Sequence, residues 1–330
     1  MIGLIDIGIH PGLPYLSGYS IRLSTLDAAG RWQAENQAHK SDLHGSRVAS
    51  ILCGPFYENA LPSTTAIEAI AIPRRGKTIL CLLRALDAML RANIRVLCLP
   101  WGINLPTPVF QPFIKALTER GVLVVAPSGN KGLGTVLTPG AYPEVLTVGA
   151  LDANGNIARY SGRYETGGKP ELYIRGTFPA PADPDSGKTI RGTSMACAWA
   201  AGKAARICQT DPKATSTQIK AQLGAEALVT VPPFLEKPYI DSRLQATLRP
   251  HETDDRREGI VLSGMPAEPF QMEQLLKAVE RISGCTPQEL NYFSVENVAH
   301  VCASSRFFDA LLRHQGVYCA QAVDVSMLDM

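Results

Sequence analysis

The stretch RGTSMACAWAAG, Arg191 to Gly202, has a polar start followed by small and apolar residues, a pattern that predicts a buried helix. Gly-Thr-Ser before such a run is typical of a helix N-cap, and on this interpretation Ser194 only opens the helix. The alternative is that the Ser194 hydroxyl is a nucleophile. The rest of the chain decides between the two, because a serine nucleophile needs a base and an oxyanion donor.

Three other polar residues stand where strands end or helices begin. Asp6 follows the apolar run 2–5, His44 precedes a helical pattern and is followed by Gly45, and Asn130 lies in a turn after the run 122–125. Each has an ordinary interpretation on its own: Asp6 could cap a loop, His44 could be a surface histidine, and Asn130 could belong to a Gly-Asn turn. Gly45 would let another backbone come close to His44.

Apolar runs typical of strands alternate with segments typical of helices. A run that is apolar on both faces is typical of a parallel sheet covered by helices. The expected strands are residues 2–5, 67–72, 94–99, 122–125 and 145–148, and the expected helices are 78–93 and 109–120. This pattern predicts an α/β fold with a doubly wound parallel sheet. Reactive groups in such sheets collect beyond the carboxyl ends of the strands.

The sequence pattern changes after residue 248. Residues 249–258, RPHETDDRRE, are charged and without periodicity, which is typical of a linker. Residues 259–330 then predict strand, helix, two strands, helix and strand, an order that fits a ferredoxin-like α+β domain. The expected organisation is a main domain over residues 1–248, the linker, and this smaller C-terminal domain.

The composition limits the classes of protein to which this chain can belong. Hydrophobic residues make up 45% of the 330 and charged residues 19%, which supports a large core and excludes a disordered chain. The net charge of +2 is spread over scattered residues and does not favour nucleic-acid binding. No apolar run predicts a membrane span, and MIGLIDIGIHPG is unlike a signal peptide. The eight cysteines form no CxxC pair, which favours free thiols in a reducing cytoplasm.

The order of the candidate residues along the chain points to one family. Asp, His and Ser follow each other in this order in subtilisin. Five segments are similar to motifs of the subtilisin-like serine peptidases: LIDIG (4–8), HGSRVAS (44–50), SGNKG (128–132), PGAYPEVLTVGA (139–150) and GTSMACAWAAG (192–202). They resemble the aspartate strand, the HGTxVAG motif, the oxyanion loop, a proline-rich turn before a core strand, and the GTSMAxPxVAG nucleophile helix. The resemblance covers roughly residues 1–248.

This resemblance implies a serine endopeptidase with a triad of Asp6, His44 and Ser194. Ser194 would attack the scissile carbonyl, and His44 would take its proton and return it to the leaving amine. Asp6 would hold the imidazole in the required tautomer. Asn130, together with the backbone N–H of Ser194, would bind the oxyanion.

The family holds its substrate as an added extended strand, so the resemblance also implies a binding edge. Peptide would run along Pro100, Trp101 and Gly102, and beside Ser128 and Gly129. Ser-Leu-Gly is usual at the first three positions. Two interpretations of the Trp101 ring stay open: it shapes the non-primed subsites, or it is a core aromatic beneath the sheet edge.

Two departures from the family pattern lie close to Ser194. Ala198 replaces the usual proline, and we expect Cys197 before it to be a packing residue. Elsewhere, residues 55–65, PFYENALPSTT, lack the Asn-rich pattern of the family's calcium loop. The sequence therefore does not imply dependence on a metal, and nothing in it calls for a cofactor.

Residues 298–324 resemble the last strand, helix and strand of the family's inhibitor-like pro-domain. Because Asp6 stands six residues from the start, no pro-domain is expected before it. We expect residues 259–330 to pack on the catalytic domain as a chaperone or inhibitor, with Val325 to Met330 reaching the substrate cleft. The alternatives are a fixed structural appendage and a domain that recruits a particular peptide.

The function expected from the sequence is a cytoplasmic endopeptidase restricted to particular peptide or precursor substrates. A general protease in that compartment would be harmful. Two other classes stay open: a pseudoprotease that only binds peptides, and an acyl transferase or peptide ligase on the same site. All triad and oxyanion residues are present, which argues against the pseudoprotease.

Overall fold

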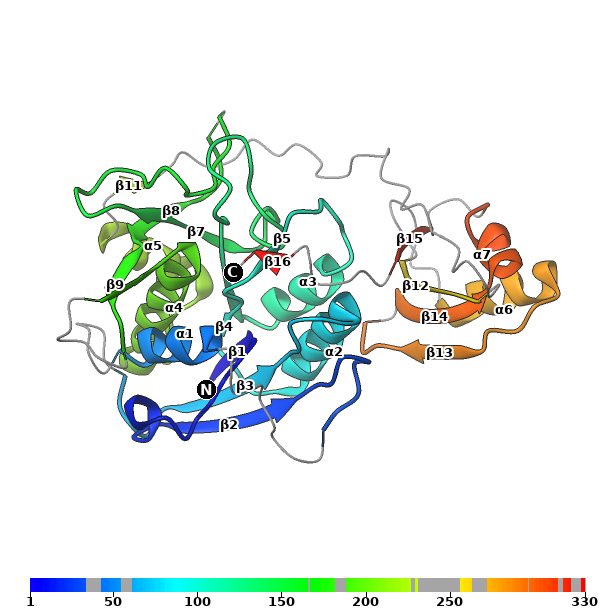
Figure 1. Ribbon diagram of the computed structural model, residues 1–330, viewed down its shortest axis with the longest axis horizontal. Coiled ribbons are helices and arrows are strands. Elements are labelled where there is room, and N and C mark those ends of the chain that lie inside the picture. The colour runs from blue at the N-terminus through cyan, green and yellow to red at the C-terminus, as the bar shows by residue number, and fades with distance from the viewer. Residues whose placement is uncertain are drawn as a thin grey trace.

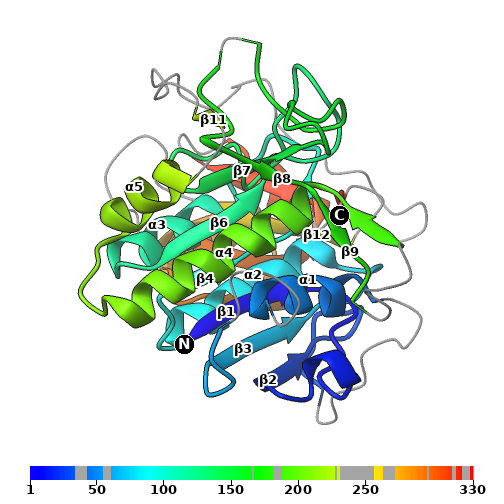
Figure 2. The ribbon, with the colours of Figure 1, turned by 90° about the vertical axis from the view of Figure 1, so that its left-hand side faces the viewer.

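An eight-stranded sheet with helices on both faces forms the main body of the chain (Figure 1, Figure 2). Neighbouring strands are parallel, except that the edge strand β11 runs antiparallel to β8. The predicted α/β fold with a parallel sheet is therefore confirmed. In sheet order the strands are β11 (Val229–Thr230), β8 (Leu172–Arg175), β7 (Leu146–Leu151), β6 (Leu123–Pro127), β4 (Val96–Cys98), β1 (Ile2–Asp6), β3 (Ala66–Ala71) and β2 (Ser20–Thr25).

The computed structural model describes most of the chain. The described residues are 1–33, 43–54, 61–165, 167–181, 188–226, 229–230, 256–262, 272–295, 297–313, 317–321 and 328–329. Within these ranges, no helix combines the length and the apolar composition that a membrane crossing requires.

Helices cover both faces of the sheet. On one face lie α1 (His44–Cys53) and α4 (Thr193–Thr210), which also packs against α5 (Ser216–Glu226). The other face is covered by α2 (Thr78–Arg91) and α3 (Gln111–Glu119). Side chains of a strand alternate between these two layers, because successive residues of a strand point to opposite faces. Leu4 packs with α1 and α4, for example, whereas Ile5 packs with α2 and α3.

Shorter elements lie at the periphery of the sheet. A 3-10 turn (Pro14–Leu16) precedes β2, and β9 (Thr177–Pro179) pairs with β10 (Thr189–Arg191) just before α4. A further two-stranded ladder joins β5 (Gly102–Ile103) to β16 (Leu328–Asp329), near the C-terminal end of the chain (Figure 1).

A second, antiparallel sheet lies in the C-terminal part. Its strand order is β13 (Glu289–Tyr292), β14 (Val298–Ser304), β12 (Arg256–Leu262) and β15 (Tyr318–Gln321). The helices α6 (Met272–Ser283) and α7 (Ser305–Leu311) cover one face around a separate apolar cluster. This is the order of a ferredoxin-like unit, with β12 starting inside the range 249–258 that the sequence assigns to a linker.

The other face of this sheet contacts the helical layer of the main body. Ile260, Leu262 and Val298 belong to the apolar cluster that α2 and α3 form beneath the main sheet. The ring of Phe293 meets that of Phe113 on α3 edge to face, with 5.5 Å between the centroids. The contact is therefore apolar at its centre.

Polar groups surround the apolar contact. Glu258 of β12 accepts hydrogen bonds from Lys77 Nζ at 2.6 Å and from His300 Nε2 at 2.5 Å. The side-chain amide of Asn291 lies 3.1 Å from His300 Nδ1, and since an amide N can only donate, the ring proton lies on Nε2. The backbone N–H of Ser294 donates to Asp87 Oδ1 at 2.7 Å.

These donors change the acidity of Glu258. Burial alone raises the pKa of its carboxyl group, but the hydrogen bonds from His300 and Lys77 outweigh burial and lower the pKa from 4.5 to about 2. Because the pKa of the folded state lies below that of the unfolded state, the ionised carboxylate stabilises the fold above pH 4.5. That stabilisation is lost as the pH falls from 4.5 towards 2.

We therefore expect Glu258→Gln to weaken the C-terminal sheet at pH 7 by about 1–2 kcal/mol, a value reduced for partial exposure of the carboxylate. Native-state hydrogen exchange at the amides of β12 and β14 measures this loss. The difference from the unsubstituted protein should shrink as the pH falls below 4.5. Glu273→Gln, which alters an exposed pair on α6, is the matched control. If the difference in exchange between Glu258→Gln and the unsubstituted protein stays constant down to pH 2, the lowered pKa of Glu258 is contradicted.

Candidate active site

The candidate residues Asp6, Pro100 and Asn130 follow three neighbouring strands of the main sheet. Asp6 ends β1, Pro100 comes two residues after β4, and Asn130 three residues after β6. Since these strands are parallel and adjacent in the order β6, β4, β1, their carboxyl ends share one edge of the sheet. Such an edge is where α/β sheets build their sites.

Asp6 and His44 are in direct contact. His44 Nδ1 lies 2.8 Å from Asp6 Oδ1 and 3.1 Å from Oδ2. The backbone N–H of Ile7 also donates to Oδ1, at 2.7 Å. Asp6 has no exposed surface, so the carboxylate depends on these donors. An imidazole that donates from Nδ1 presents Nε2 as the proton acceptor, the form a general base requires.

The approach of α1 to β1 depends on Gly45. A Cβ atom added there would lie 2.4 Å from the carbonyl oxygen of Ile7 and 3.1 Å from Asp6 Cβ. The Gly45 N–H donates to Ile7 O at 2.8 Å, and Ser46 Oγ donates to Gly8 O at 2.9 Å. The predicted close approach beside His44 is therefore observed.

Ser194 is not the cap of α4. The helix begins at Thr193, and its N-cap is Gly192, whose φ of 145° lies in a region that side chains rarely adopt. Ser194 is 1% exposed, and its Oγ has no hydrogen-bond partner among the described residues. The N-cap position thus belongs to Gly192, and Ser194 lies in the first turn of the buried helix. α4 packs against α1, so His44 and Ser194 each lie in the first turn of a helix of the same layer.

Asn130 is oriented by Thr193. Its Oδ1 accepts from the Thr193 N–H at 3.0 Å and from Thr193 Oγ1 at 3.1 Å. Because both contacts use the oxygen, the amide nitrogen is turned away from Thr193. A Cβ atom added at Gly192 would lie 3.8 Å from Asn130 Nδ2 and 4.0 Å from the Ser194 nitrogen. The side-chain amide of Asn130 and the backbone nitrogen of Ser194 therefore both lie beside Gly192, at the start of α4.

The residues expected to bind substrate lie in two segments next to this space. Pro100, Trp101 and Gly102 run from β4 into β5, whereas Ser128 and Gly129 connect β6 to Asn130. All five are buried. The ring of Trp101 has no exposed surface and meets that of Phe110 edge to face at 5.7 Å, which places it in the core beneath the edge.

The strand β16 lies along β5, next to the segment expected to bind substrate. It pairs antiparallel with β5, with Leu328 opposite Ile103 and Asp329 opposite Gly102 (Figure 1). The tail expected to reach the cleft was Val325 to Met330, of which residues 325–327 and 330 lie outside the described part. Its described residues therefore pair with the strand along which substrate was expected to bind.

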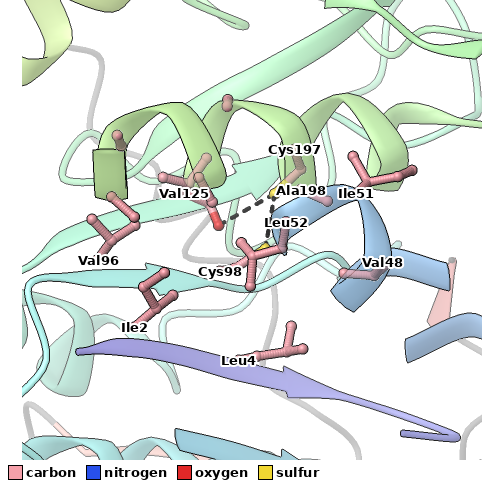
Figure 3. Close-up of a cluster of buried hydrophobic side chains, with 14 of the residues drawn as sticks. Ile2, Leu4, Val48, Ile51, Leu52, Val96, Cys98, Val125, Cys197 and Ala198 are labelled. Atoms are coloured by element: carbon pink, nitrogen blue, oxygen red, sulfur yellow. Dashed lines mark hydrogen bonds between the residues drawn. The ribbon is translucent and has the colours of Figure 1, made fainter. Parts of the chain in front are cut away.

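Two cysteines, Cys197 on α4 and Cys98 on β4, meet between this helix and the main sheet (Figure 3). Cys197 Sγ donates to Val125 O at 3.5 Å and lies 3.9 Å from Cys98 Sγ. Burial, followed by the neighbouring Cys197, raises the pKa of the Cys98 thiol well above its ordinary value. Both side chains are fully buried, as expected of packing residues. With Ala198 in place of proline, α4 runs unbroken from Thr193 to Thr210.

The sequence did not single out two residues that contact the site. Thr193 orients Asn130, and its place inside the Gly-Thr-Ser motif was the available signal. Leu137 lies against both Gly102 and Gly129, and nothing local marks it except the proline two residues later. As for metals, no cluster of three His, Cys, Asp or Glu side chains occurs in the described ranges.

Comparison with known proteins relates the chain to one family. The model of the subtilase family matches residues 1–260. Subtilisin BL from Lederbergia lenta is 29% identical over 238 residues, which cover 67% of this chain and 81% of that protein. An alkaline protease from Alkalihalobacillus alcalophilus is 35% identical over 236 residues, which cover 67% of this chain and 57% of that protein.

Solved structures show the same fold. The S41 psychrophilic protease has a TM-score of 0.55 at 23% identity, over 68% of this chain and 81% of its own. The prenylagaramide maturation protease PagA has a TM-score of 0.52 at 21% identity, over 67% and 80%. The nisin leader peptidase NisP from Lactococcus lactis has a TM-score of 0.51 at 18% identity, over 67% and 80%. Since the family model spans most of the sequence, this chain belongs to the subtilase family and is a subtilisin-like serine endopeptidase.

Proposed function

We propose that this endopeptidase uses Ser194 as nucleophile, His44 as general base and Asp6 as the carboxylate that orients His44. The observation that carries the proposal is the Asp6–His44 hydrogen bond of 2.8 Å at the carboxyl edge of the sheet. Asn130 Nδ2 and the Ser194 N–H would bind the oxygen of the tetrahedral intermediate. In this role the helix N-terminus at Ser194 favours negative charge.

The reaction follows from these positions. Ser194 Oγ attacks the scissile carbonyl carbon as its proton passes to His44 Nε2, and the imidazolium is stabilised by the Asp6 carboxylate. His44 then protonates the leaving amine, and the acyl group stays on Ser194. Water attacks this ester with His44 again as base. The buried setting of Asp6 strengthens its interaction with the imidazolium, because little solvent screens the pair.

The substrates we propose are particular peptides or precursor peptides, cleaved in the cytoplasm. Two structural neighbours are titled a maturation protease and a leader peptidase. A restricted choice of substrate is also supported by β16, since it lies on the edge that a substrate strand would use. Within this proposal, substrate binds as an extended strand antiparallel to β5.

The role of Ser194 is tested by a fluorophosphonate probe, which reacts with an activated serine. We expect the protein to be labelled and to cleave peptides, and Ser194→Ala to lose the label and about 10⁶-fold in kcat, the loss seen on removing the subtilisin nucleophile. Ser63→Ala, at an exposed serine, is the matched control. Labelling that persists in Ser194→Ala would refute the assignment. Mass spectrometry of the products separates cleavage from ligation.

The role of Asn130 is tested by Asn130→Ala. Loss of one oxyanion donor should lower kcat by about 10²–10³-fold with little change in KM, because the donor acts mainly on the transition state. Asn154→Ala changes an exposed asparagine in a loop and should leave both constants unaltered. An increase confined to KM would mean that Asn130 only binds substrate.

We further propose that residues 259–330 form a separate domain that packs on the catalytic domain and that its tail competes with substrate. The apolar contact of Ile260, Leu262 and Val298 with α2 and α3 supports the packing. The pairing of β16 with β5 supports the competition. The alternative is that this domain recruits a particular peptide, and the test must distinguish recruitment from competition by the tail.

Removing residues 324–330 tests the competition. We expect KM to fall several-fold with kcat unchanged, because substrate no longer has to displace β16. The peptide VSMLDM, added to the truncated protein, should then inhibit competitively, whereas a peptide of the same composition in scrambled order should not. A KM that rises would instead favour recruitment, and unchanged activity and peptide affinity would refute a role for the tail.

A further inference from the structure

We propose that Leu137 fills the pocket for the substrate side chain next to the scissile bond and restricts that residue to glycine, alanine or serine. The residue meant is the one whose carbonyl Ser194 attacks. This inference rests on the proposed function, because it uses the positions of Ser194 and Asn130.

Two glycines, Gly102 and Gly129, pack closely against the side chain of Leu137. A Cβ atom added at Gly102 would lie 2.6 Å from Leu137 Cβ and 3.0 Å from Cδ1. One added at Gly129 would lie 2.3 Å from Leu137 Cγ and 2.4 Å from Cδ1. The leucine therefore occupies the volume that both glycines leave open. Gly129 has a φ of 93°, so this position favours glycine for its backbone as well.

The position of the glycines identifies this volume as a pocket for substrate. Gly129 directly precedes Asn130, and Gly102 lies on β5, along which we propose that the peptide runs. The scissile carbonyl oxygen would lie between Asn130 Nδ2 and the Ser194 N–H. The Cα that carries this carbonyl is one bond from the carbonyl carbon, so its side chain starts between the oxyanion loop and β5. That is the space between Gly129 and Gly102.

Leu137 is held there by its backbone. Its N–H donates to Ser128 O at 3.0 Å, and the next residue, Thr138, exchanges hydrogen bonds of 2.8 and 3.1 Å with Ile103. The segment therefore ties the oxyanion loop to β5. Leu137 is 1% exposed, and a side chain that is buried against two backbone segments has little freedom to move away. A large substrate side chain would need the same volume, whereas a hydrogen atom, a methyl or a hydroxymethyl group needs far less.

The test is a series of peptides that differ only in this residue, with Gly, Ala, Leu or Phe. We expect kcat/KM of the unsubstituted enzyme to be highest for Gly and Ala. Leu137→Ala should raise kcat/KM for Leu relative to Ala by about 10- to 200-fold, the scale of one or two methylene groups in an apolar pocket. Leu133→Ala, the same change at a side chain that is 54% exposed, should keep the original order.

A second measurement does not depend on catalysis. Product peptides that end in Ala or Phe are bound to Ser194→Ala and to Ser194→Ala with Leu137→Ala, and calorimetry gives their affinities. We expect the first variant to prefer Ala, and the second to lose or reverse that preference. Circular dichroism confirms that each variant is folded.

The outcomes separate the two proposals. The pocket assignment is overturned if the unsubstituted enzyme cleaves the Phe peptide as well as the Ala peptide. It is also overturned if Leu137→Ala leaves the ratio of kcat/KM for the Leu and Ala peptides unchanged. If no peptide is cleaved and the fluorophosphonate does not label Ser194, the proposed function has failed. The affinities of the product peptides then test the pocket assignment on their own. Affinities that do not depend on the terminal residue, or no binding of any product peptide, overturn the assignment.

Discussion

Asp6 carries a carboxylate without exposed surface, and the arrangement of the site follows from how this group is hydrogen-bonded. A buried carboxylate is costly unless donors replace its water. One donor, the N–H of Ile7, comes from the turn after β1, whereas His44 lies on a different element. α1 must therefore begin within hydrogen-bond distance of the end of β1. Gly45 makes this possible, since any side chain there would collide with the Ile7 carbonyl.

Much of this could be predicted from the sequence, because the signals are local. Strands β1, β3, β4, β6 and β7 are mainly apolar, and helices α2 and α3 have apolar residues at helical spacing beside a charged face. The six elements of the C-terminal part follow the expected order for the same reason. Asp6, His44, Asn130 and Ser194 became candidates because each stands at the end of a recognisable strand pattern or at the start of a helical one, and their order along the chain gave them a joint meaning.

The parts that could not be predicted depend on contacts between distant segments. β2 (Ser20–Thr25) has no continuous apolar run, since it is the edge strand and only part of it is buried. The tail was expected at the substrate cleft, but its pairing with β5 was not: the two segments are more than 200 residues apart, and two residues of a ladder leave no periodicity to detect. Leu137 is an ordinary apolar residue in the sequence. Its importance comes from the two glycines that surround it, one in each of two separate segments.

β5 explains why these distant contacts meet. Neighbouring residues of a strand direct their N–H and C=O groups to opposite edges. Ile103 directs its groups to Thr138, with which it exchanges two hydrogen bonds, so Gly102 presents its groups on the opposite edge, where Asp329 of β16 lies across from it. One edge of β5 thus fixes the segment that carries Leu137. A peptide can add to the other edge only in place of β16, so the same two-residue strand supports both the proposed size restriction and the proposed competition.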